Sequence, residues 1–132
     1  MIHSALPMLI KSKGTLVNIS SIAATMPYSR GSTYGATKAY IKTLSEYLRM
    51  DMSNTKCRII NIEPGIVHTE FRAVRMNEST NKADEYYTAI PSIKPLDIAN
   101  AIYYALSQPD YVNIDSVLVS ATDWARPGFY SK

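Results

Sequence analysis

Three segments decide the fold: the sequence TLVNIS at residues 15–20, a helical stretch from 32 to about 52, and the sequence CRIINI at residues 57–62. Each apolar run has the composition of a strand that is covered on both faces in a parallel sheet. Between them, apolar residues recur at helical spacing, and Ser32 or Thr33 is expected as the N-cap. A strand, a helix and a second strand form a βαβ unit with a right-handed crossover. The sequence therefore predicts an α/β protein.

The flanking segments extend this pattern. Residues 1–12 have apolar side chains at helical spacing, interrupted by Pro7, and resemble the end of a helix. Residues 69–94 show no single period, which predicts a loop with short helices that can act as a lid. Pro95 opens a further amphipathic helix, and residues 112–120 are expected to form the last strand.

Length and composition are those of one globular domain, with 132 residues of which 46% are hydrophobic and 19% charged. The 14 Lys and Arg are scattered among 11 Asp and Glu, a pattern that does not favour nucleic acid. Cys57 is the single cysteine, so we expect a reducing compartment and no metal site. Residues 1–13 lack a basic secretory start, and no apolar run approaches the ~20 residues of a membrane span. We expect a cytoplasmic protein with no nucleic-acid or membrane partner.

Polar residues with a shared chemical use follow the predicted strands. Ser21 comes just after the first strand, and Pro64 and Gly65 follow the second. Tyr34 and Lys38 lie four residues apart at the start of the long helix, so their side chains share one face. Because ligands of open α/β sheets bind outside the carboxyl ends of the strands, we expect these groups to meet in one crevice.

These residue types suit proton transfer at an alcohol or carbonyl. A lysine ammonium near a phenol favours the phenolate, so Tyr34 beside Lys38 could exchange a proton with such a substrate. Ser21 could donate a hydrogen bond to the same substrate oxygen as charge develops on it. No side chain supplies a hydride, so a redox reaction here requires a cofactor.

Three motifs resemble those of the short-chain dehydrogenase/reductase family in order and spacing. They are Asn18-Ile19-Ser20-Ser21-Ile22-Ala23, then Tyr34-Gly35-Ala36-Thr37-Lys38-Ala39, then Glu63-Pro64-Gly65-Ile66-Val67-His68-Thr69-Glu70-Phe71. The resemblance implies that Ser21 and Tyr34 bind the substrate oxygen, that Tyr34 transfers the proton, and that Lys38 and Tyr34 contact the cofactor. The nicotinamide carboxamide would be held by the turn formed by Pro64, Gly65, Ile66, Val67 and Thr69.

Later segments are similar to the NADP-dependent 3-hydroxy acid and serine (allo-threonine) dehydrogenase branch of that family. They are Thr69-Glu70-Phe71, Val74-Arg75, Lys82-Ala83, Asp97-Ile98-Ala99 and Val112-Asn113-Ile114-Asp115. This resemblance implies NADP as cofactor, with NAD as an alternative, and a small hydroxy acid or its carbonyl form as substrate. Arg72 and Arg75 follow the cofactor turn, and Arg75 is the candidate for binding the substrate carboxylate. The alternative is that both arginines are solvated surface residues.

The family's glycine-rich turn and first strands have no counterpart in this sequence, which has five dispersed glycines. Residues 1–132 therefore resemble a single, partial Rossmann-like domain, the C-terminal half of a doubly wound, three-layer α/β/α fold. We do not expect such a half to be active alone, because it has no candidate for the pyrophosphate-binding turn. The alternative function is that of a non-catalytic fragment serving as a dimerisation or interaction module. By the same resemblance, the full-length form is expected to be a homodimer or homotetramer.

Overall fold

Three parallel strands form the central sheet of the computed structural model, which describes residues 2–124. They are β1 (Thr15–Ile19), β2 (Arg58–Pro64) and β3 (Ser116–Val119), in the order β1-β2-β3. Thr15 lies opposite Arg58 in the first pairing, and Asn61 lies opposite Ser116 in the second. The predicted parallel α/β architecture is confirmed.

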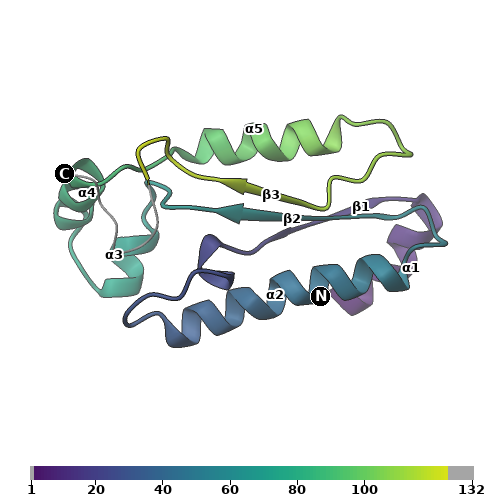
Figure 1. Cartoon of the computed structure of the whole chain (residues 1–132), viewed down its shortest axis with the longest axis horizontal. Coiled ribbons are helices and arrows are strands. Elements are labelled where there is room, and N and C mark those ends of the chain that lie inside the picture. The colour runs from purple at the N-terminus through teal and green to yellow at the C-terminus, as the bar shows by residue number, and fades with distance from the viewer. Residues whose placement is uncertain (1, 125–132) are drawn as a thin grey trace.

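Helices cover both faces of this sheet (Figure 1). Helix α2 packs against β1 and β2 from one side, while α5 packs against β2 and β3 from the other, which gives the expected three layers. The helical elements are α1 (Ile2–Ser12), the 3-10 turn η1 (Ile22–Ala24), α2 (Ser32–Asp51), α3 (Phe71–Met76), α4 (Thr80–Ala89) and α5 (Pro95–Leu106). Among residues 2–124, no helix has both the length and the apolar character needed to cross a membrane.

The core lies around β2. Ile60 and Ile62 are completely buried and pack with Ala105 of α5, which is also inaccessible. Ile59, on the same strand, is 1% exposed. A strand with no exposed face is what the near-continuous apolar run of residues 57–62 predicts.

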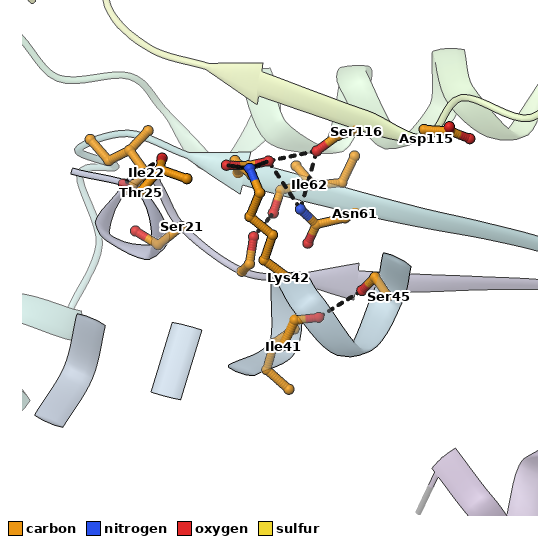
Figure 2. Close-up of polar contacts among 12 residues, drawn as sticks. Ser21, Ile22, Thr25, Ile41, Lys42, Ser45, Asn61, Ile62, Asp115 and Ser116 are labelled. Carbon is orange, nitrogen blue, oxygen red and sulfur yellow. Dashed lines mark hydrogen bonds and ion pairs between the residues drawn. The ribbon is translucent and has the colours of Figure 1, made fainter. Parts of the chain in front are cut away.

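Buried polar groups join the layers near the end of β2. The Glu63 carboxylate, 5% exposed, accepts hydrogen bonds from Lys42 of α2 at 2.9 and 3.0 Å. It also accepts one from Asn61 at 3.1 Å and one from the Ser116 hydroxyl of β3 at 2.6 Å. The side chains of Lys42, Asn61 and Ser116 thus converge from three elements (Figure 2). This network ties α2 to the carboxyl end of β2.

The predicted N-cap of the long helix is wrong. Gly31 occupies that position, and its cap is not completed by a side-chain hydrogen bond, while Ser32 and Thr33 are already helical. Gly31 is buried beneath the ring of Tyr28, where a β-carbon would lie 2.6 Å from a ring atom. Helix α2 therefore begins at Ser32, directly after a glycine that contacts the Tyr28 ring.

The last strand is shorter than the predicted 112–120 and begins at Ser116. The Asn113 side chain accepts a hydrogen bond from the Ile59 backbone nitrogen at 2.9 Å and donates one to the Ile59 carbonyl at 3.2 Å. An amide side chain thus occupies the pairing groups that a longer β3 would use, so backbone pairing starts only after it.

Candidate active site

A pocket of about 640 Å³ lies at the carboxyl ends of β1 and β2. Every site residue predicted from the sequence lines it, although they come from separate parts of the chain. These residues are Ser21, Tyr34, Lys38, Pro64, Gly65, Ile66, Val67, Thr69 and Arg75. The expected convergence at one edge of the sheet is therefore present.

Ser21, which follows β1, is connected to Pro64, the last residue of β2. It is the N-cap of η1, and its hydroxyl oxygen accepts a hydrogen bond from the Ala23 nitrogen at 3.2 Å. The same hydroxyl donates to the Pro64 carbonyl at 3.4 Å. Ser21 is 6% exposed, so its side chain has a fixed place in the pocket wall.

Tyr34 and Lys38 come from successive turns of α2, with Tyr34 in the first turn. The Lys38 Nζ lies 5.8 Å from the centroid of the Tyr34 ring and donates a hydrogen bond to the Ile19 carbonyl at 2.9 Å. Burial lowers the pKa of the Lys38 ammonium, because desolvation penalises its charged form. The helix thus brings a partly buried cation close to a phenol at the end of β1.

We expect the contribution of Lys38 to the free energy of unfolding to rise as the pH increases toward the ordinary pKa of lysine. Lys38 has a lowered pKa when folded, so between that value and its unfolded value the unfolded chain binds more protons. Urea unfolding across alkaline pH should show this rise for the unchanged chain relative to Lys38→Met. A difference between the two that is flat or falls with pH would contradict the expectation.

The turn after β2 is held from both sides. The Gly65 nitrogen donates to the Val119 carbonyl at 2.7 Å, and a β-carbon on Gly65 would lie 3.2 Å from that oxygen. Ile93 donates to the Ile66 carbonyl at 2.9 Å and accepts from the His68 nitrogen at 2.8 Å. This segment is therefore a fixed backbone wall facing the pocket.

His68 lies in this turn but is not among the residues that line the pocket. Its ring nitrogen Nε2 lies 2.9 Å from an Asp84 oxygen of α4, and its ring stacks on Tyr87 at 4.5 Å. The His68 ring is therefore held by contacts with α4 and does not line the pocket.

The two arginines of α3 have different surroundings. Arg72 pairs with Glu78 at 3.1 Å, and its guanidinium carbon lies 3.6 Å from the centroid of the Tyr86 ring. Arg75 donates to the Tyr28 hydroxyl at 2.8 Å, and its guanidinium carbon lies 4.6 Å from the centroid of the Tyr34 ring. Arg75 is therefore the arginine that adjoins the Ser-Tyr-Lys group.

Sequence reasoning did not identify three aromatic side chains of the pocket. They are Tyr28, Phe71, whose ring centroid lies 5.5 Å from that of Tyr34, and Trp124. Phe71 is part of a motif that resembles the family, but Tyr28 and Trp124 belong to segments without periodic patterns. The path of the folded chain, and not local sequence, brings them here.

The charged side chains in the described lining of the pocket are all basic. The lining contains Arg30, Lys38, Arg72 and Arg75 and no aspartate or glutamate. Within residues 2–124, no group of three or more His, Cys, Asp or Glu side chains could hold a metal ion. The pocket therefore favours an anionic ligand.

The parallel sheet with a pocket at its carboxyl edge is the arrangement of an open α/β protein. The model of the short-chain dehydrogenase family matches residues 1–80, more than half of the 132-residue chain. The chain belongs to this family, and the predicted resemblance is confirmed.

The chain is also similar to individual relatives and to solved structures of this family. Over 127 residues the chain is 42% identical to serine 3-dehydrogenase of Agrobacterium fabrum, covering 96% of this chain and 51% of that protein. It is 37% identical over 119 residues to the NADP-dependent 3-hydroxy acid dehydrogenase YdfG of Escherichia coli, and the match covers 89% of this chain and 48% of that protein. A closed form of serine dehydrogenase complexed with NADP⁺ superimposes with a TM-score of 0.91 at 33% identity. The match covers 100% of this chain and 54% of that one. The chain thus spans about half the length of the relatives it matches.

Proposed function

We propose that this chain provides the proton-transfer and nicotinamide-binding part of an NADP(H)-dependent oxidoreductase. Its reaction interconverts a small 3-hydroxy acid with the corresponding carbonyl compound. The observation that carries the proposal is the meeting of Ser21, Tyr34 and Lys38 in one pocket with the turn after β2. Three separate elements supply these groups, and together they match the chemistry that the residue types allow.

NADP as cofactor is supported by the names of relatives and by the character of the pocket. Several relatives are named as NADP-dependent, and one similar structure is a complex with NADP⁺. The basic side chains of the lining suit a polyanionic dinucleotide, and Gly65 lies among the lining residues. Lys38 would contact the nicotinamide ribose, and the turn from Pro64 to Thr69 would hold the carboxamide. NAD is the alternative cofactor.

The proposed roles of the side chains follow from their placement. When bound, the nicotinamide exchanges a hydride with the substrate carbon. Tyr34 exchanges a proton with the substrate oxygen, and its hydroxyl hydrogen is the one that moves. Ser21 donates a hydrogen bond to that oxygen, and the Lys38 ammonium stabilises negative charge on the Tyr34 oxygen. Arg75 binds the substrate carboxylate from the α3 side of the pocket.

Cofactor binding by the purified chain tests this proposal. Trp124 is the only tryptophan and lines the pocket, so energy transfer from it to reduced nicotinamide reports a bound cofactor. We expect saturable NADPH binding that Lys38→Ala weakens and that Lys82→Ala leaves unchanged, because Lys82 is a 67% exposed lysine of α4. Binding that responds equally to both substitutions would contradict the assigned site.

Exposed apolar side chains on α2 favour a second candidate, a non-catalytic interaction module. Tyr40, Tyr47 and Met50 are 64%, 63% and 72% exposed. An exposed apolar surface of this kind often marks an interface. Size-exclusion chromatography of the chain, alone and with an intact relative, tests this function. A chain that stays monomeric and does not associate with the relative would contradict the interaction-module function.

A further inference from the structure

We propose that Tyr28 and Gly31 set the substrate charge preference of the site by positioning Arg75 to bind a carboxylate. This inference rests on the proposed function and deepens it, since it names residues that select acid over neutral substrates. Tyr28 acts through Arg75 and is a positioning residue. Gly31 acts through Tyr28 by leaving room for its ring.

The first observation is the set of contacts that the exposed Arg75 side chain makes. Its Nη1 donates to the Tyr28 hydroxyl at 2.8 Å, and the guanidinium carbon lies 5.7 Å from the centroid of the Tyr28 ring. It also lies 4.6 Å from the Tyr34 centroid and 5.9 Å from the Phe71 centroid. The guanidinium is thus held among three aromatic rings, one of which carries the proposed proton-transfer hydroxyl.

The second observation is the charge of Arg75. Among residues 2–124, its one hydrogen-bond partner is the neutral Tyr28 hydroxyl, and no carboxylate pairs with it. Arg72, one turn away, is already neutralised by Glu78 at 3.1 Å. A guanidinium has five N–H donors in a fork that matches a carboxylate. Arg75 therefore has the charge and the donors for a small organic anion.

The third observation explains why the Tyr28 ring can lie where it does. A β-carbon built on Gly31 would lie 2.6–2.8 Å from three Tyr28 ring atoms, which is too close for any real contact. Only glycine at this position admits the ring against the start of α2. Gly31 is also the N-cap of the helix that carries Tyr34. The same glycine therefore contacts the ring that positions Arg75 and begins the helix of the proposed proton donor.

A carboxylate bound to Arg75 would lie beside the Tyr34 ring, because the guanidinium carbon lies 4.6 Å from its centroid. A short hydroxy acid can place its carboxylate on Arg75 and its hydroxyl on Tyr34. A neutral alcohol of the same length gains nothing from Arg75. The arrangement therefore selects small acids through charge and position together.

Binding measurements on the purified 132-residue chain test this proposal. Isothermal titration calorimetry with 3-hydroxypropanoate and with the neutral 1,3-propanediol compares Tyr28→Phe, Gly31→Ala and Arg75→Met with the unchanged chain. Tyr111→Phe is the matched control, because this tyrosine is 89% exposed. NADPH affinity is measured in parallel through Trp124, and circular dichroism checks that each variant is folded.

We expect Tyr28→Phe to weaken binding of the acid about tenfold, the effect of losing one hydrogen bond to a charged group. Gly31→Ala should produce a similar loss by displacing the ring, and Arg75→Met a larger one. Binding of the diol and of NADPH should stay within the range of the control.

The proposal is overturned if the unchanged chain does not bind the acid, or if Tyr28→Phe affects acid and diol equally. It is also overturned if Tyr28→Phe weakens NADPH and leaves the acid unchanged, since Arg75 would then serve a cofactor phosphate. If the acid shows the expected pattern but NADPH does not bind, the cofactor part of the proposed function fails while the role of Tyr28 stands.

Discussion

Replacing Tyr34 with phenylalanine is expected to lower the turnover number by a factor of roughly 10²–10⁴, the usual contribution of a positioned proton donor. The substitution removes only the phenol oxygen. The ring that lies 5.5 Å from Phe71 and 4.6 Å from the Arg75 guanidinium is retained. The loss should therefore appear in turnover and far less in the affinity for NADPH.

Because this half is not expected to be active alone, the measurement uses it in place of the matched half of the Agrobacterium fabrum serine 3-dehydrogenase, to which it is 42% identical. The rate of oxidation of serine and of 3-hydroxypropanoate is measured from the formation of reduced nicotinamide. Tyr40→Phe is the matched control, since Tyr40 lies on the same helix and is 64% exposed. Retention of more than about a tenth of the turnover by Tyr34→Phe would remove Tyr34 from the proton-transfer role.

The arrangement of strands and helices was predictable because local sequence and tertiary packing agree there. β2 is buried along its length, so its apolar run identifies a central strand without further information. Boundaries were less predictable where a distant side chain replaces a backbone partner. Asn113 takes the pairing groups of Ile59 and shortens β3, a contact that connects residues 54 positions apart.

The candidate site was predictable to the extent that it follows from strand ends. Ser21 and the turn at Pro64 follow parallel strands, and Tyr34 and Lys38 are related by helical spacing, so topology alone brings them together. The difference between Arg72 and Arg75 was not predictable, because it depends on Glu78 and Tyr28. Glu78 lies between α3 and α4, whereas Tyr28 lies in the loop before α2, so the two partners come from separate segments.

The same limit applies to the polar network beneath the site. Asn61 and Glu63 interrupt an apolar strand, and the sequence alone does not show what compensates them. In the fold, Lys42 lies one turn beyond Lys38 on α2. Its Nζ lies within 3.0 Å of both carboxylate oxygens of Glu63. Ser21 donates to the carbonyl of the next residue, Pro64. The helix of the proton donor and the proposed cofactor turn are therefore joined through Glu63.

Replacing Lys42 with methionine is expected to lower the free energy of unfolding by about 3 kcal/mol, because it leaves a buried carboxylate without its counter-ion. Asn61 and Ser116 still donate to that carboxylate, but neither supplies a positive charge. Urea unfolding at neutral pH measures the loss, with Lys82→Met as the exposed control expected to change stability by less than about 0.5 kcal/mol.

The double variant Lys42→Met with Glu63→Leu separates the charge from the packing. Removing both charged groups also removes the uncompensated carboxylate, so we expect the pair of substitutions to recover much of the stability that Lys42→Met loses. The Asn61 amide and Ser116 hydroxyl lose an acceptor in the double variant, which keeps the recovery incomplete. Losses that simply add would show that Lys42 and Glu63 stabilise the fold independently, and the ion pair would no longer explain how α2 is held against β2.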